Sequence, residues 1–171
     1  MHPAAQFCYT GPGLPGSDVI TAYADTNGDN VRQSTEPTDT ATKLWVLPAS
    51  TPGCKVTNGG RITAANGDKA TFGGNAKADS LSGEEEYQDH GPARSMNVHS
   101  TTITAVTCNA AGTAASIFGT ATVNGGGSFD FRIDVADNGE PGRNDTYRIR
   151  LSNGYDSGVQ TLAAGGNVQI H

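Results

Sequence analysis

The sequence predicts an all-β protein, an antiparallel β-sandwich with a short N-terminal strand segment. Its apolar residues, mostly Val, Ile, Ala and Phe, stand at alternating positions, which is typical of strands with one buried face. Glycine, with 23 residues, and asparagine interrupt these runs at regular spacing, as turns do in sandwiches and barrels. The only helix-compatible stretch is "SGEEEYQ", which is too short to be stable alone.

The overall charge excludes one large class of partner. With a net charge of −6 and no basic patch, the chain lacks the Lys/Arg footprint that nucleic-acid binding needs. No apolar run is long enough to cross a bilayer, so we expect no membrane insertion. Because Met1, His2 and Pro3 lead directly into strand-like sequence, we expect either that a leader has been removed or that the chain belongs to a longer protein.

Two strands are expected in the N-terminal part, "SDVITAYA" at 17–24 and "DTATKLWVL" at 39–47. No 3.6-residue apolar period flanks the polar segment between them, so we expect it to join two antiparallel strands. The following "PASTPG" holds two prolines, small residues and a glycine, and it predicts a linker. The predicted domains are residues 1–47, the linker 48–53 and residues 54–171.

The polar segment "DTNGDNVRQSTE" has the ligand spacing of a twelve-residue calcium loop. Side-chain oxygens stand at positions 1, 3, 5 and 12 of the loop, and a backbone carbonyl is available at position 7. The predicted calcium ligands are Asp25, Asn27, Asp29, Val31 through its carbonyl, and Glu36. Position 6 holds Asn30 where the helix-loop-helix form has glycine, and asparagine tolerates the left-handed backbone needed there. The alternative is a polar turn whose acids face water.

Calcium bound in this loop is expected to act on stability. Without metal, repulsion among Asp25, Asp29 and Glu36 would splay the loop, and binding would stabilise the fold through linkage. A sensor role is not expected, because the sequence predicts no helix pair that calcium could open.

The C-terminal region contains about eight further strand candidates with Gly and Asn turns between them. In "FDFRIDVAD" and "TYRIRLS" the apolar residues share one face. The predicted inward residues are Phe129, Phe131, Ile133 and Val135 in the first run, and Tyr147, Ile149 and Leu151 in the second. We expect these runs to be neighbouring core strands joined by the turn "NGEPGRND".

The three cysteines are far apart, with no CxxC pair that would indicate zinc or thiol redox chemistry. Few lysines and abundant Thr, Gly and Asn indicate an exported β-protein with one disulfide. We favour the pair Cys54–Cys108, which closes a loop of about 55 residues and is worth roughly 4 kcal/mol. Pairing of Cys8 with either of them is the alternative.

The stretch from Phe7 through Trp45 resembles the closing strands of a bacterial immunoglobulin-like repeat. Such modules end in an acidic loop, a Glu-Pro pair and a Thr-rich last strand, which here are "DTNGD", Glu36-Pro37 and "TDTATKLW". A full repeat has several more strands before the position of Phe7. The resemblance therefore implies that the usual partner of Cys8 lies in those strands.

Residues 54–171 resemble a β-rich module found at the C-terminal ends of many secreted bacterial proteins, the post-COAP-like module. The stretches that carry the resemblance are "VTNGGRIT", "KATFGGNAK", "YQDHG", "VHSTTIT", "FGTATVNG", "VADNGEPGRNDTYRIRLS" and "GGNVQIH". The resemblance implies an extracellular setting and no catalytic residues. We expect the sandwich to be jelly-roll-like or immunoglobulin-like.

Other polar groups have simpler structural explanations. The acidic stretch 137–145 can gather around a cation, but its two glycines and its proline predict a tight hairpin. Ser100, His99 and Asp89 can be combined into a hydrolase set, yet no nucleophile elbow frames the serine. The acid run "GEEEYQDH" is better explained by a solvated loop than by a glycosidase site.

These features together predict a non-catalytic structural or adhesion module, secreted or displayed on a bacterial cell surface and stabilised by calcium. Its expected partner is a cell-surface or extracellular-matrix glycan or protein. Its N-terminal strands are too few to be stable alone, so we expect them to pack on the C-terminal sandwich or to self-associate. The alternative is a carbohydrate-binding accessory module of a secreted hydrolase, with Tyr87 and Tyr155 in Gly/Asp-rich loops as glycan-binding residues.

Overall fold

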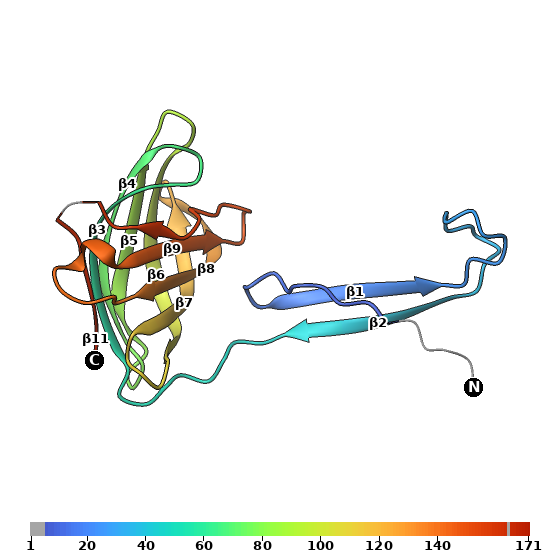
Figure 1. Ribbon diagram of the computed structural model, residues 1–171, viewed down its shortest axis with the longest axis horizontal. Coiled ribbons are helices and arrows are strands. Elements are labelled where there is room, and N and C mark those ends of the chain that lie inside the picture. The colour runs from blue at the N-terminus through green and yellow to red at the C-terminus, as the bar shows by residue number, and fades with distance from the viewer. Residues whose placement is uncertain (1–5, 164) are drawn as a thin grey trace. The chain divides into compact units, whose positions relative to one another are not determined.

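The computed structural model of the protein describes residues 6–163 and 165–171. The chain divides into two units, one ending at Val46 and one spanning Leu47–His171. Both are built from antiparallel strands, so the predicted all-β class is confirmed (Figure 1). Among the described residues the one helical element is the short turn η1 (Gly142–Asn144), and no helix has the length and apolar composition needed to span a membrane.

The first unit is a two-stranded hairpin of β1 (Gly16–Tyr23) and β2 (Thr38–Trp45). The strands pair antiparallel from Gly16 with Trp45 to Tyr23 with Thr38, so the polar segment joins two antiparallel strands as predicted. Beyond the last pair, the Ala24 amide donates to the Pro37 carbonyl at 2.9 Å. Almost all side chains of this hairpin are exposed.

The first unit has little buried core, and its side chains are held together mainly by contacts around Trp45. The indole Nε1 donates to Asp18 Oδ2 at 2.7 Å, and the Tyr9 hydroxyl donates to the same oxygen at 3.1 Å. Gly11 lies directly against the indole ring, since a Cβ there would come within 2.5 Å of it. The segment before β1 is therefore held to the end of β2 by one aromatic side chain and one carboxylate.

The second unit is a single nine-stranded antiparallel sheet in the order β10-β9-β8-β7-β6-β5-β4-β3-β11. Its strands are β3 (Lys55–Thr63), β4 (Lys69–Lys77), β5 (Ser82–His90), β6 (Ser95–Cys108), β7 (Ala114–Val123), β8 (Gly126–Ala136), β9 (Thr146–Leu151), β10 (Gln160–Thr161) and β11 (Asn167–Ile170). Consecutive strands from β3 to β9 are neighbours, and β11 returns beside β3. The sheet curls so that its halves face each other across one core, as the layers of a sandwich do (Figure 1).

The two ends of the curled sheet are joined by hydrogen bonds. The Ala163 amide donates to the Arg61 carbonyl at 2.7 Å, and the Ala65 amide donates to the Ser157 carbonyl at 2.8 Å. The buried Asp145 accepts a further bond from the Val168 amide at 2.8 Å. The acidic stretch 137–145 joins β8 to β9 as predicted, but through the short turn η1 and not as a tight hairpin.

The residues that the alternating patterns predicted to face inward form the core. Strands β8 and β9 pair with Ile133 opposite Ile149, and their inward side chains are buried. The confirmed core residues are Phe131, Ile133, Val135, Tyr147, Ile149 and Leu151, whereas Phe129 is only partly buried. Across the core, the rings of Phe72 and Tyr147 stack with centroids 3.8 Å apart.

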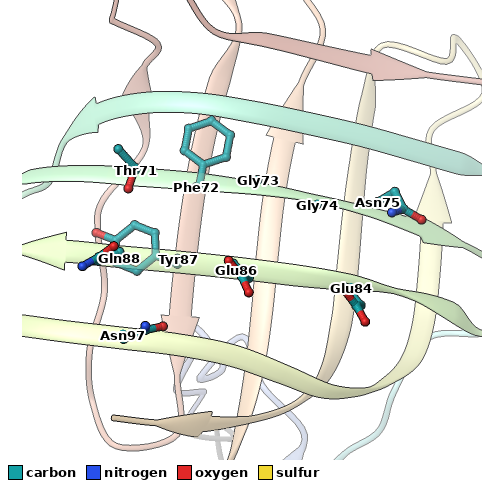
Figure 2. Close-up of a pocket in the computed structure, with 10 residues that line it drawn as sticks. All are labelled: Thr71, Phe72, Gly73, Gly74, Asn75, Glu84, Glu86, Tyr87, Gln88 and Asn97. Atoms are coloured by element: carbon teal, nitrogen blue, oxygen red, sulfur yellow. The ribbon is translucent and has the colours of Figure 1, made fainter. Parts of the chain in front are cut away.

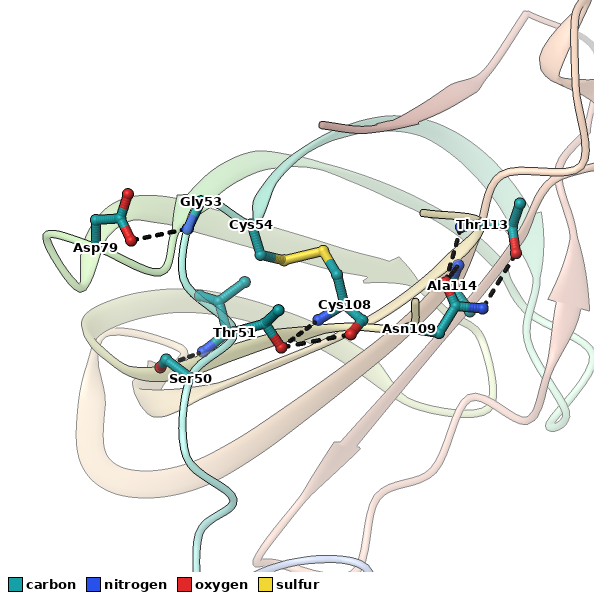
Figure 3. The surroundings of a disulfide bond; sticks show 10 residues. Ser50, Thr51, Gly53, Cys54, Asp79, Cys108, Asn109, Thr113 and Ala114 are labelled. Atoms are coloured by element: carbon teal, nitrogen blue, oxygen red, sulfur yellow. Dashed lines mark hydrogen bonds between the residues drawn. A yellow bond between two sulfur atoms is a disulfide. The ribbon is translucent and has the colours of Figure 1, made fainter. Parts of the chain in front are cut away.

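The disulfide joins Cys54 and Cys108, the pair favoured from the sequence, and Cys8 is free and exposed (Figure 3). The stretch 48–53, predicted to be a linker, is bound to the second unit beside this bridge. The Cys108 amide donates to Thr51 Oγ1 at 3.1 Å, and the Val106 amide donates to Ser50 Oγ at 3.1 Å. The two polar side chains give the segment fixed partners that its composition does not indicate.

Candidate functional site

Asp25 organises the first half of the acidic loop. Its carboxylate accepts hydrogen bonds from the amides of Gly28 at 2.7 Å and Asn30 at 2.8 Å. These bonds, with that from Asn30 contributing most, lower the pKa of Asp25 because they favour the charged carboxylate. Asn30 has φ of 59°, so the left-handed backbone expected at the sixth loop position is present.

Glu36 closes the loop from its inner side. The residue is 4% exposed, whereas its neighbours in sequence are exposed. One carboxylate oxygen accepts from the Thr26 amide at 3.0 Å and the other from the Gln33 amide at 2.9 Å. The twelfth position of the loop is therefore folded back over its beginning.

The remaining predicted ligands are linked through Asp29. Its carboxylate accepts from the Val31 amide at 2.8 Å, from Asn27 Nδ2 at 3.1 Å and from Gln33 Nε2 at 2.6 Å. The structure thus brings all five predicted positions into one compact loop.

The loop carries the hard oxygen donors that calcium prefers. Within the described part of the chain, however, no three His, Cys, Asp or Glu side chains lie close enough together to hold a metal ion. The carboxylates of Asp25 and Glu36 point at backbone amides, and that of Asp29 is also bound by two side-chain amides. A carboxylate has about four lone-pair sites, so the carboxylates can still accept further ligands. For calcium to bind, however, the carboxylates of Asp25, Asp29 and Glu36 would have to turn toward one point.

The expectation that Tyr87 and Tyr155 form an exposed glycan platform is wrong. Tyr87 lies in β5 and not in a loop, and both rings are buried, at 1% and 5% exposure. Their hydroxyl groups hydrogen-bond to each other, and Tyr155 also donates to Asp89 Oδ2 at 2.8 Å. Burial raises the pKa of Tyr87 to about 12 and raises that of Tyr155 as well, so both are neutral core residues.

The acid run of β5 is divided between the two faces of the strand rather than lying in a solvated loop. Glu84 and Glu86 are exposed, whereas Glu85 is 2% exposed and points into the core with Tyr87. Asn58 Nδ2 donates to both Glu85 oxygens. Burial raises the pKa of Glu85 to about 7, because few groups in the core stabilise its charge.

The structure does not assemble the hydrolase set considered above. His99 is exposed, with Nδ1 3.0 Å from Glu86 Oε1. Ser100 faces the opposite side of β6, where its hydroxyl accepts from the Glu85 amide at 2.8 Å. Asp89 is buried beside Tyr155, so the three side chains do not form one site.

The outer face of β4, β5 and β6 has a depression of about 390 Å³ (Figure 2). Gly73 lies on its β4 side, opposite Glu86 of β5. The polar side chains around it are Thr71, Asn75, Glu84, Glu86, Gln88 and Asn97. The one sequence signal of this set is the alternation in β5, which puts Glu84, Glu86 and Gln88 on the face opposite Tyr87. This alternation does not show which residues of β4 and β6 lie beside them.

Four of these side chains are available to a ligand. Thr71 bonds to His90, and Glu86 bonds to His99. The side chains of Asn75, Glu84, Gln88 and Asn97 make no hydrogen bond to any residue in the described ranges. The depression therefore offers amide donors and amide and carboxylate acceptors directly to solvent.

Comparison of the chain with protein-family models, with curated proteins and with solved structures finds no match.

Proposed function

We propose that the chain is a non-catalytic structural and adhesion module, secreted or displayed on a bacterial surface, whose N-terminal hairpin is stiffened by calcium. The observation that carries the proposal is the geometry of the acidic loop. All five predicted ligand positions are gathered between β1 and β2, the sixth position is left-handed, and Glu36 is folded inward. The resemblance of residues 54–171 to a module of secreted bacterial proteins agrees with this role.

One further feature, the disulfide, supports an extracellular setting, and the calcium level outside cells is compatible with the proposed loop site. A disulfide such as Cys54–Cys108 persists in oxidising compartments, and it is rare in the reducing cytosol. Extracellular calcium is present at about the millimolar level at which weak loop sites of extracellular modules are occupied.

Calcium would act on the stability of the hairpin rather than on catalysis. The two-stranded unit has a small aromatic cluster of Phe7, Tyr9 and Trp45 and little buried surface, and isolated two-stranded hairpins are marginal in water. Metal binding would neutralise the repulsion among Asp25, Asp29 and Glu36 and would add its binding free energy to the folded state. A stiff hairpin is suited to spacing or display of the unit that follows it.

The proposal is tested by calorimetric titration of calcium into the EDTA-stripped full chain. We expect one site with a Kd of about 0.1–1 mM, which is the range of extracellular modules. Asp25→Ala should abolish the binding heat. Asp39→Ala, which removes an exposed acid of β2 outside the loop, is the matched control and should leave it unchanged. Absence of heat with the unsubstituted chain would reduce the loop to a polar turn.

A second candidate function is glycan binding by an accessory module of a secreted hydrolase. The specific observation in its favour is the polar depression over Gly73, with four side chains free to bind. The buried tyrosines have no part in this candidate.

A further inference from the structure

We propose that the depression on the outer face of β4, β5 and β6 binds a neutral glycan, which lies over Gly73. The proposal rests on the adhesion role, because it names the ligand class through which the module would attach. It does not depend on calcium.

Two glycines leave free space on this face of the sheet, although neither position requires glycine. Gly59 and Gly73 are directly opposite each other on β3 and β4, and neither has a positive φ. A Cβ at either position would meet nothing nearer than a backbone oxygen at 3.9 Å. Both sites have room for a side chain, which would favour the strand more than glycine does.

The adjacent Gly74 differs from Gly73, because it has no room for a side chain. A Cβ on the inward-facing Gly74 would lie 2.2 Å from the Glu84 carbonyl oxygen and 2.4 Å from Glu85 Oε2. Packing therefore requires Gly74, whereas it does not require Gly73. Glycine that packing does not require in the middle of a strand often marks a place where a ligand approaches the backbone closely.

The chemistry around Gly73 favours a neutral polyhydroxylated ligand. The amides of Asn75, Gln88 and Asn97 are both donors and acceptors, and the Glu84 carboxylate accepts, so together they match neighbouring sugar hydroxyl groups. Glu84 and Glu86 disfavour anionic ligands, and no Lys or Arg lines the depression. An extended peptide would pair with the edge of a sheet, whereas this depression lies on a face.

The same chemistry predicts weak binding. Tyr87 and Phe72 contribute to the floor from the core side, and their rings are buried, so the described residues that line the depression offer no exposed aromatic ring for stacking on a sugar. The ligand would be held by hydrogen bonds to exposed side chains alone, each of which contributes little against water. Affinity in the millimolar range is therefore expected for one copy, and display of many copies on a surface would raise it through avidity.

The experiment is an NMR titration of the ¹⁵N-labelled full chain in EDTA with neutral gluco-, manno-, galacto- and xylo-hexasaccharides. Hyaluronan and heparin oligosaccharides are the anionic comparison. We expect at least one neutral sugar to shift amides of 71–75, 84–88 and 97–99 at millimolar concentration, and the anionic ones to shift none. No shift with any neutral sugar, shifts elsewhere, or preference for the anionic sugars would overturn the proposal.

Two variants then test the site. Gly73→Thr should weaken binding by about tenfold or more and leave the melting temperature equal or higher, because the new side chain fills the depression and favours the strand. Gly126→Thr is the matched control on β8, where a Cβ has room because nothing lies within 4 Å of it, and it should leave binding unchanged. Gln88→Ala should weaken binding by about three- to tenfold.

Two outcomes of the variant experiments would contradict the proposal. Sugar binding that survives in Gly73→Thr would show that the ligand does not lie over this position. Loss of folding in Gly73→Thr would show that the glycine serves the curl of the sheet. Because the titrations are made in EDTA, failure here leaves the calcium proposal standing, and absence of calcium binding by the unsubstituted chain leaves this proposal standing.

Discussion

Asn58 Nδ2 donates to both carboxylate oxygens of Glu85, at 3.0 Å each, inside the curled sheet. Asn58 Oδ1 is buried and has no hydrogen-bond partner within residues 6–163 and 165–171. A buried carboxylate with one neutral side-chain donor is poorly compensated when charged. The pair therefore makes the core of the second unit sensitive to pH.

This sensitivity has a definite sign. The folded-state pKa of Glu85 is about 7, above its ordinary value of 4.5, so the folded state binds the proton more tightly than the unfolded chain. Its contribution to stability is complete below about pH 4.5 and is lost as the pH rises through 7, at up to about 1.4 kcal/mol per pH unit and about 3 kcal/mol in all. Urea unfolding between pH 4.5 and 8 measures it.

Substitution of Glu85 separates this effect from other titrating groups. Glu85→Gln should flatten the pH dependence and should be more stable than the unsubstituted chain at pH 8, because a neutral amide replaces the buried charge. Glu84→Gln changes the exposed neighbour and should keep the original slope. Equal slopes in all three proteins would show that Glu85 stays uncharged or hydrated.

The disulfide should supply a large part of the stability of the second unit. Cys54 and Cys108 are separated by 54 positions, and opening a loop of this size costs about 4 kcal/mol in the chain-entropy model. The double variant Cys54→Ala/Cys108→Ala should lose about this much in urea unfolding. Cys8→Ala, at an exposed free thiol, should lose almost nothing. Comparable losses in both would contradict the assigned pairing.

Asp145 should be essential for the contact between the ends of the sheet. It is fully buried, and its two oxygens accept from the amides of Asn138 and Val168, both at 2.8 Å. Asp145→Ala would leave two amides without an acceptor and should cost about 3 kcal/mol. Asp137→Ala, which removes one partly exposed acceptor of the same turn, should cost less than about 1 kcal/mol by the same urea measurement.

The hairpin is expected to associate with a second copy. Both of its strands have an unpaired edge within the hairpin sheet, and Val19 on β1 is 69% exposed. Sedimentation velocity should show a concentration-dependent dimer that Val19→Lys weakens. Val159→Lys places the same charge on a 63% exposed valine of the second unit and is the control. A monomer at every concentration would contradict self-association.

Alternation predicted the strands well because one face of each strand is buried. The inward residues of β8 and β9 follow the period of two, and the two strands pair as expected. The same period accounts for Glu85, Tyr87 and Asp89 on one face of β5. An acid run next to glycine and aspartate suggested a solvated loop instead, because composition says nothing of the neighbouring strands that bury one face.

The polar depression was beyond prediction from the sequence for a related reason. The adjacent Gly73 and Gly74 are indistinguishable in the sequence, and only the register of β4 with β3 and β5 puts one outside and the other against Glu85. The place of the acidic loop between two antiparallel strands was predictable because its residues are local in sequence. Calcium affinity would depend on how easily Asp25, Asp29 and Glu36 leave their amide partners, which ligand spacing does not encode.

Hydrogen exchange of the hairpin amides with and without calcium tests the central claim most directly. Saturating calcium stabilises the state that binds it by about 2.7 kcal/mol at one hundred times Kd. The amide of Ala24, which donates to the Pro37 carbonyl and not to a calcium ligand, should therefore exchange about tenfold or more slowly with calcium, while that of Ile133 in the second unit keeps its rate. Identical exchange of the Ala24 amide in calcium and in EDTA would contradict a calcium-stiffened module.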